Sequence, residues 1–477
     1  MNKEAHEIAK DGIRKDGVSH YEATSDQLAS FENAHNSLRS FYTPRLMSSE
    51  SSRQRIFIAA FDGTGNDALN DPTHKTNVGN ISAEIDAISD PRIATSYLRG
   101  PGTQEDVASR LWDGATGYTH DRRAEDMYKS FTDQAREWLE EDPRADISVV
   151  AIGFSRGAEI AAQFTRIVDE RGIQNPDGAE YVVGSDKLVR RAVHSLPPLV
   201  APGEVPQAVG LFDPVNTGRP EDRDRRLPPS VVSGFQIIAG DERRNKFKSD
   251  HIIDPGLSPD GRFLGVTVAG AHSDIGGSYH RNGLSVRSGH LMKDYLNSLS
   301  DQPFLQKKLE PDNPGLNVVH RSEEGMLLYR LDRKVDRQSP EGQNKLLVPM
   351  SQRNKVDNPY DAEPRDEAIH NRFEHHPVRS GARTQGLHES APHGITKHSS
   401  SKSMFEAYVD AKLRGDDAAC REIAHAYSET PKGQAFLAKG RELFQQEQAI
   451  EKQQEQSLGC QSPAERAPAQ RAPSMRR

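Results

Sequence analysis

Short hydrophobic runs alternate with amphipathic stretches along the middle of the chain. Each run ends in polar or glycine-rich sequence, as buried strands of a parallel sheet commonly do. The runs lie at residues 56–61, 147–152, 208–212, 235–239 and 263–269. Because helical sequence separates them, the pattern predicts an α/β fold with a mostly parallel sheet flanked by helices.

Two amphipathic stretches carry the helical pattern most clearly. Residues 120–141 repeat apolar side chains at about every fourth position and stop just before Pro143. Residues 158–171 are rich in alanine and follow a hydrophobic run after only a short glycine-containing turn. The order strand, tight turn, helix is therefore expected around residue 155.

The flanks of this region are more polar and suggest four segments. Residues 1–53 are predicted to form a polar N-terminal arm, and residues 54–300 the α/β core that carries the candidate chemistry. Residues 301–402 are expected to form a cap or insertion that is partly irregular, because the chain from 337 to 403 is crowded with Pro, Asn, Arg, His and Ser. Residues 403–477 are expected to form a helical C-terminal appendage with a disordered tail.

Composition limits the class of protein. Sixty-two Lys and Arg against 70 Asp and Glu give a net charge of −8, which argues against a nucleic-acid partner. Hydrophobic residues make up 34% of the chain, so part of it does not contribute to a packed core. The only cysteines, Cys420 and Cys460, give no disulfide framework and suit a reducing cytosol. No run is long enough to span a bilayer, and residues 1–15 lack the apolar segment of a signal peptide.

The strongest chemical signal is the sequence Gly-Phe-Ser-Arg-Gly at residues 153–157. It matches the G-x-S-x-G turn that exposes a nucleophilic serine between a strand and a helix. The motif fixes only three positions, so by itself it also fits a glycine-rich turn with a surface serine. Its position directly after a hydrophobic run and before an Ala-rich helix favours Ser155 as a nucleophile.

A nucleophilic serine needs a base, and the base needs an orienting acid. Asp213 follows one hydrophobic run and His272 follows a later one, in the order that α/β hydrolases use. We expect Asp213 to be the acid and His272 the base. Asp241, after the intervening run, and Asp274, two residues beyond His272, are alternative acids. Asp274 could instead orient its loop or bind a cation, and Asp213 could simply be a turn residue before Pro214.

The loop after the first run, Asp-Gly-Thr-Gly-Asn at residues 62–66, is rich in glycine. In this fold class such a loop supplies a backbone N–H to an oxyanion, which gives Gly63 and Thr64 an oxyanion or substrate-binding role. Arg156, beside the serine, either contacts substrate or supports the turn through a salt bridge. No metal site or cofactor is expected, although a requirement for a divalent cation such as calcium stays open.

Together the motifs resemble a known family. The segments FDGTGND, THKTNV, YLRGPGT, IGFSRGA, GLFDPV, GDERR and GAHSDIGGSY, between Arg55 and Tyr279, are similar in order to those of the type VI secretion lipase effectors (Tle, first class). The resemblance implies an α/β-hydrolase fold and a phospholipase of the A type, with Ser155, Asp213 and His272 as its triad. This chain departs from the family in Asp213-Pro214-Val215, where Asp-Thr-Val is usual.

The resemblance also implies a cellular location and a set of partners. An antibacterial effector of this family stays in the cytoplasm of the producing cell until it is secreted, without a signal peptide, into the periplasm or membrane of a target bacterium. Its partners would be membrane phospholipid as substrate, an immunity protein and a secretion-spike protein. A hydrolase of soluble esters and a non-catalytic secretion-associated module are the alternatives that sequence leaves open.

Overall fold

A computed structural model describes residues 8–63, 66, 74–100, 120–184, 188–215, 223–311, 313–379, 417–428, 430 and 434. The chain divides into two compact units, residues 1–384 and residues 385–477. The four-segment division expected from composition stays a prediction. No helix among the described residues is long and apolar enough to cross a membrane.

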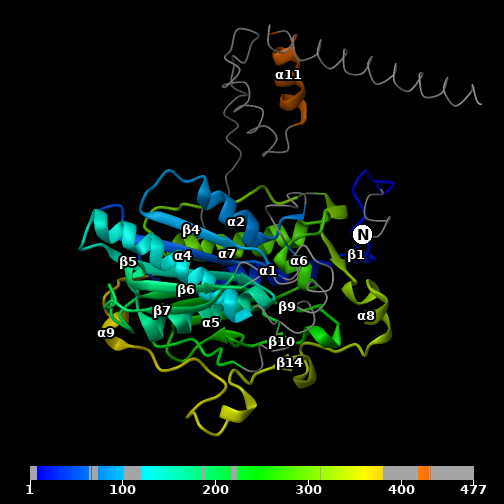
Figure 1. Cartoon of the computed structure of the whole chain (residues 1–477). Coiled ribbons are helices and arrows are strands. Elements are labelled where there is room, and N and C mark those ends of the chain that lie inside the picture. The colour runs from blue at the N-terminus through cyan, green and yellow to red at the C-terminus, as the bar shows by residue number, and fades with distance from the viewer. Residues whose placement is uncertain are drawn as a thin grey trace, which may run out of the picture. The chain divides into compact units, whose positions relative to one another are not determined.

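A seven-stranded sheet forms the centre of the first unit (Figure 1). Its strands are parallel except for the β11–β12 pair, and their spatial order is β11-β12-β9-β8-β5-β3-β4. In chain order they are β3 (Gln54–Phe61), β4 (Ile93–Leu98), β5 (Asp146–Phe154), β8 (Gln207–Phe212), β9 (Val231–Ala239), β11 (Gly256–Leu257) and β12 (Phe263–Val268). The five hydrophobic runs thus become strands as predicted. The sequence pattern missed β4, an edge strand whose side chains are mostly only half-buried.

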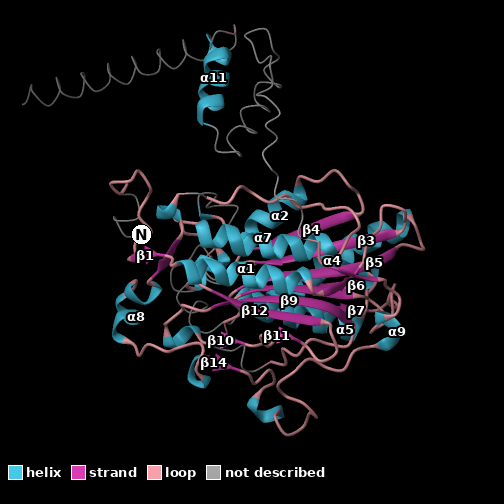
Figure 2. Cartoon of the chain, turned by 180° about the vertical axis from the view of Figure 1, so that it is seen from behind, coloured by secondary structure: helices cyan, strands magenta, loops and turns pink. Residues whose placement is uncertain are grey.

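Helices cover both faces of this sheet (Figures 1 and 2). Alternate residues of β3 point to opposite faces: Ile56 and Ile58 join one hydrophobic core, whereas Phe57 and Ala59 join the other. The first core is covered by α1 (Ser25–Arg39), α2 (Asn77–Asp86) and α7 (Gly283–Ser298), and the second by α4 (His120–Glu141) and α5 (Arg156–Arg171). This is the α/β arrangement with flanking helices that the sequence predicts.

The order of the connections reverses next to β3. The chain runs from β3 to β4 on one side and then returns to place β5 on the other side of β3. In open α/β sheets, ligands bind beyond the carboxyl ends of the strands at such a switch point. Here those ends carry Asp62 after β3 and Ser155 after β5.

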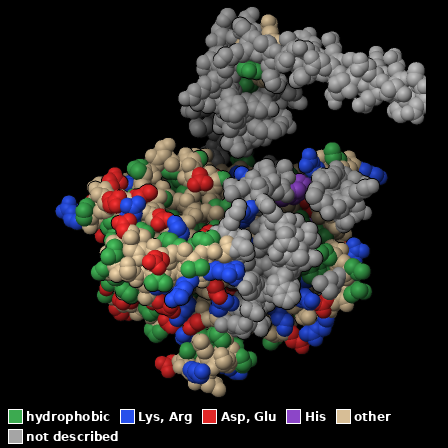
Figure 3. Space-filling model, viewed as in Figure 1, with side chains coloured by type: hydrophobic (Ala, Val, Ile, Leu, Met, Phe, Trp, Pro, Cys, Tyr) green, Lys and Arg blue, Asp and Glu red, His purple; other side chains and the backbone are tan. Residues whose placement is uncertain are grey.

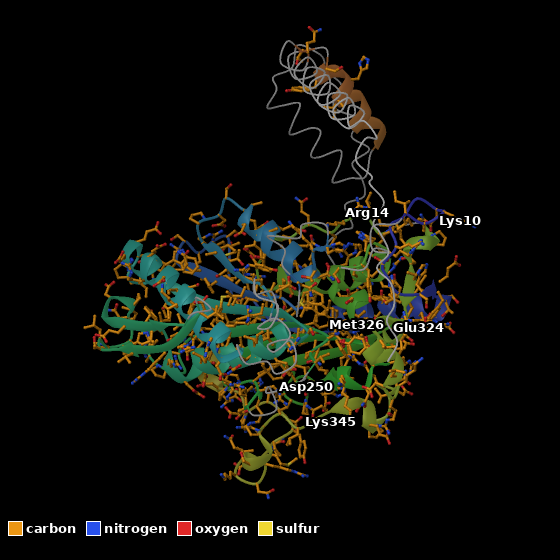
Figure 4. The ribbon with its side chains drawn as sticks, turned by 45° about the vertical axis from the view of Figure 1, so that its right-hand side comes forward. Lys10, Arg14, Asp250, Glu324, Met326 and Lys345 are labelled. Carbon is orange, nitrogen blue, oxygen red and sulfur yellow. The ribbon has the colours of Figure 1, made fainter. Side chains whose placement is uncertain are left out.

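The N-terminal segment is built into the first unit. Thr24 and Gln27 form a reciprocal capping box that starts α1, and the helix buries Phe31, Ala34 and Leu38 in the core. Upstream, β1 (His20–Glu22) pairs with β13 (Val318–His320). Figure 4 accordingly shows Lys10 and Arg14 on the same side of the molecule as Glu324 and Met326. Sequence set residues 1–53 apart because most are polar, yet a few apolar positions at helical spacing anchor them.

The segment after residue 300 also returns to the core, through short pairings. β15 (His375–Pro377) pairs with β2 (Tyr42–Pro44), and β14 (Gln343–Asn344) pairs with β10 (Ser249–Asp250). The remaining short elements are β6 (Ala179–Val183), β7 (Val189–His194), α6 (His272–Gly276), α8 (Leu327–Leu331) and α9 (Glu367–His370). In the second unit, α11 covers Asp417–Ser428. Side chains of both charge signs are interspersed over the coloured part of the face in Figure 3.

Candidate active site

Ser155 occupies a strained turn between β5 and α5. Its φ of 58° and ψ of −127° lie outside the usual regions for a residue with a side chain, which typically costs about 1–3 kcal/mol. A Cβ on Gly153 would lie 2.5 Å from the carbonyl oxygen of Gly157, and one on Gly157 would lie 2.3 Å from that of Phe61. Both glycines are therefore required for the close approach of strand and helix, as in a nucleophile elbow.

Asp213 and His272 form a buried pair next to this turn. Asp213 follows β8 with a φ of 42°, and its Oδ2 lies 2.6 Å from His272 Nδ1. The Ser155 amide donates to the carbonyl oxygen of Phe212, at 3.0 Å, and the rings of Phe154 and His272 are 4.6 Å apart. The three residues named from sequence thus share immediate neighbours at the carboxyl ends of the strands.

Buried charge sets the protonation of this pair. Burial alone would raise the pKa of Asp213, but the charge of Arg337 and the hydrogen bond to His272 outweigh it and lower that pKa. Burial lowers the pKa of His272, against the opposing effect of Asp213. An ionised carboxylate beside a neutral imidazole follows at neutral pH, and this is the resting state of a general base.

A second ion pair supports the imidazole from its backbone side. The amide of His272 donates to Glu242 Oε2 at 3.2 Å, and Glu242 also pairs with Arg244 at 2.8 Å. Burial would raise the pKa of Glu242, yet Arg244 lowers it to about 2. Phe247 stands edge-on to the His272 ring at 5.1 Å. The imidazole is thus held on several sides before any substrate binds.

The two alternative acids face elsewhere. Asp241 accepts the amide of Gly270 at 2.8 Å, so it fixes the loop that leads to His272. Asp274 accepts from Nδ1 of His320 at 2.5 Å and from the amide of Ala271 at 2.9 Å. Among the described residues, neither carboxylate is hydrogen-bonded to the His272 ring. Asp213 is the acid that the fold brings to the imidazole, and Asp274 orients its loop.

The expected oxyanion donors are only partly in place. The Gly63 amide donates to its neighbour, Asp62 Oδ1, at 2.7 Å, so in this conformation it does not point into the site. This differs from the sequence expectation because Asp62 is itself held by the hydroxyl groups of Thr76 and Tyr97. Thr64 lies outside the described residues. Arg156 is buried and begins α5, where first-turn N–H groups have no intrahelical acceptor; its role as a donor stays a prediction.

A family model describes this region. Residues 55–193 match the type VI secretion phospholipase effector Tle1-like catalytic domain. The resemblance read from the motifs is confirmed there. This Tle1-like region contains β3, the Asp62 loop and Ser155, and it ends before Asp213 and His272. A search of curated proteins finds no match.

Two solved structures are similar to the chain at low identity. One is the Tle1 effector bound to the VgrG spike of the type 6 secretion system, at 19% identity and a TM-score of 0.31, over 47% of this chain and 51% of that one. The other, an uncharacterized protein from Pseudomonas aeruginosa, has 15% identity and a TM-score of 0.33, over 63% of this chain and 52% of that one. The chain spans about half the length of each, and neither likeness assigns a fold.

Sequence reasoning missed two residues that shape the site beyond the Tle1-like region. Glu242 follows the alternative acid Asp241 in sequence, and the run Asp-Glu-Arg-Arg gave no sign of which carboxylate lies against His272. Arg337 lies in the segment predicted to be an irregular cap, yet its side chain is bonded to Asp213. No local pattern marks Arg337, because its partner is more than a hundred residues away.

Proposed function

We propose that this protein is a serine-dependent phospholipase of the A type that hydrolyses carboxylic esters of membrane phospholipids. The observation that carries the proposal is the buried His272–Asp213 pair beside the strained Ser155 turn. The match of residues 55–193 to Tle1-like phospholipase effectors supports the substrate class. The parallel sheet with its strand-turn-helix serine supports an α/β-hydrolase fold.

In the proposed reaction each of the three side chains has one role. The Ser155 hydroxyl attacks the acyl carbon, and Nε2 of His272 accepts its proton while Asp213 holds Nδ1. The tetrahedral oxyanion forms next to the first turn of α5, whose N–H groups and positive dipole end favour negative charge. The imidazolium then protonates the departing lysophospholipid oxygen. Water, activated by the same histidine, hydrolyses the acyl-enzyme.

The remaining features of an effector belong to the same proposal. An antibacterial role, passage from the producer's cytoplasm to a target cell, an immunity protein and a secretion-spike partner all follow from family membership. Among the described residues, no group of three or more His, Cys, Asp or Glu side chains could hold a metal ion. A serine mechanism itself uses no metal ion, so the proposed reaction should proceed unchanged after chelation of calcium.

Ser155→Ala tests the proposal. Purified wild-type protein should release fatty acid from phosphatidylglycerol–phosphatidylethanolamine vesicles and react with a fluorophosphonate probe, and the variant should do neither. Equal lipid hydrolysis by both proteins would exclude the serine mechanism. Probe labelling without hydrolysis of vesicles, but with hydrolysis of short-chain esters, would keep the triad and reject the phospholipid substrate.

A further inference from the structure

The segment that follows the sheet in sequence places the side chain of Arg337 against Asp213. Arg337 is 3% exposed, and its guanidinium donates to Oδ1 of Asp213, the carboxylate oxygen that does not face His272. The same Nη1 donates to the carbonyl oxygen of Ala239 at 3.1 Å. The amide of Ala239 in turn donates to Asp213 Oδ1 at 2.9 Å. The carboxylate is therefore fixed at both oxygens.

The other guanidinium nitrogens of Arg337 bind the backbone of Phe247, which lies beside His272. Nε and Nη2 donate to the carbonyl oxygen of Phe247, at 3.0 and 2.6 Å. Phe247 is the residue whose ring stands edge-on to His272. One planar guanidinium thus bridges the acid of the pair and the residue that packs on its histidine, a fork geometry that lysine cannot reproduce.

Local structure explains how an arginine from so late in the chain is held there. Its carbonyl oxygen accepts from Nε2 of Gln343 at 2.9 Å, and β14 ties that glutamine to β10. A Cβ on Gly342 would lie 2.1 Å from the carbonyl oxygen of Asp336, so the turn after Arg337 is tightly closed. Figure 1 shows α8 and β14, the elements on either side of Arg337 in sequence, in the same half of the molecule as α6, which begins with His272.

We propose that Arg337 is a positioning residue that balances the charge of Asp213 and locks the Asp213–His272–Phe247 arrangement. The inference rests on the proposed serine mechanism. A buried carboxylate with only a neutral imidazole for a partner would be strongly desolvated. With Arg337 beside it, the acid stays ionised without having to draw a proton onto His272, which leaves the imidazole able to accept the proton of Ser155.

The charge balance predicts a direction for the pH dependence. Without Arg337, the carboxylate either raises the proton affinity of His272 or takes a proton itself. Both changes move the acidic limb of the pH–rate profile, where the rate of the Ser155 reaction falls as pH decreases, to higher pH. The loss of an opposite charge next to Asp213 should move it by about one unit. A purely structural arginine would change yield or melting temperature and leave that limb where it is.

The experiment is the rate of fluorophosphonate labelling of full-length protein from pH 5 to 9, which reports the base of the free enzyme without a lipid substrate. Arg337→Gln should move the acidic limb upward by about one unit. Arg337→Lys should keep the limb near its wild-type position and label less than tenfold more slowly, since it keeps the charge and loses the Phe247 contacts. Arg333→Gln is the matched control, because Arg333 pairs only with the exposed Glu341 among the described residues.

Each result decides the matter. Labelling that depends on Ser155, with the same acidic limb in Arg337→Gln as in wild type, overturns the inference and leaves the proposed function intact. Labelling that persists in Ser155→Ala overturns the proposed function itself. If Arg337→Gln does not fold, the labelling of Arg337→Lys decides. Slower labelling with an unchanged acidic limb supports the link that Arg337 makes between Asp213 and Phe247, and labelling at the wild-type rate refutes it.

Discussion

Two buried histidine–aspartate pairs lie close together in this protein and differ in charge. His272 and Asp213 are separated by 2.6 Å, and His320 and Asp274 by 2.5 Å. The pKa of His272 is lowered, whereas that of His320 is raised to about 9. At neutral pH the imidazole of the first pair is therefore neutral, and that of the second pair is protonated.

The surroundings of each carboxylate explain the difference. At His272, burial outweighs the hydrogen bond and the charge of Asp213, which also pairs with Arg337. His320 is desolvated too, but it lies between Asp274 and Asp16, 3.0 Å from its Nε2, and the two carboxylates outweigh burial. Distance between the partners is almost the same in both pairs. The balance between burial and the carboxylates around each imidazole therefore sets its charge at neutral pH.

The largest expected effect is a loss of activity when the first pair, His272 and Asp213, is changed. Asp213→Asn should lower the rate of ester hydrolysis by about 10³- to 10⁴-fold, because the amide leaves His272 in the wrong tautomer. Steady-state kinetics of the folded variant measures this. Asp241→Asn is the control and should stay within about tenfold of wild type, since Asp241 only fixes a loop. Similar losses in both variants would mean that Asp213 is not the orienting acid.

The corresponding change at the second pair should act on stability. Asp274→Asn leaves His320 with one carboxylate and should lower the free energy of unfolding by about 3–5 kcal/mol, as expected for breaking a buried ion pair. Urea denaturation followed by circular dichroism measures it. Asp254→Asn is the control: Asp254 pairs with His251 at 2.8 Å but is about half exposed, so the expected loss is about 1 kcal/mol or less.

The pH dependence of stability should report His320. A histidine whose pKa rises from ~6.5 in the unfolded chain to about 9 in the fold contributes fully below the lower value and loses that contribution as pH rises through the higher one. The free energy of unfolding should therefore fall by roughly 3 kcal/mol between pH 6.5 and 9.5. Urea midpoints across this range give the slope, and His320→Gln should flatten it. An equally steep slope in that variant would assign the effect to another group.

The smallest effect is expected from Asp16, the carboxylate on the Nε2 side of His320. Asp16→Asn removes a charge but keeps an oxygen that can accept from the amides of His280 and Arg281. The free energy of unfolding should fall by about 1–2 kcal/mol. The alkaline loss of stability should also begin at a lower pH than in wild type. If stability begins to fall at the same pH in this variant as in wild type, Asp274 alone holds the proton on His320.

Local sequence predicted the features that depend on neighbouring residues. The strands formed because β-branched and other apolar side chains occur in uninterrupted runs, and the Ser155 turn formed because glycines flank it in a strand-to-helix junction. Position at strand ends also identified Asp213 and His272. Local pattern gave no sign that the Gly63 amide would donate to Asp62, because the position of Asp62 depends on hydroxyl groups from Thr76 and Tyr97.

The sequence by itself determined the strand-turn-helix order around Ser155 and the positions of Asp213 and His272 after later strands. Only the tertiary structure decided which carboxylate faces which histidine, and that Arg337 neutralises Asp213 while Asp16 adds charge around His320. The reason is physical. Propensity and periodicity act over a few neighbouring residues, whereas desolvation and charge in a buried site are set by side chains that chain folding brings together from distant segments.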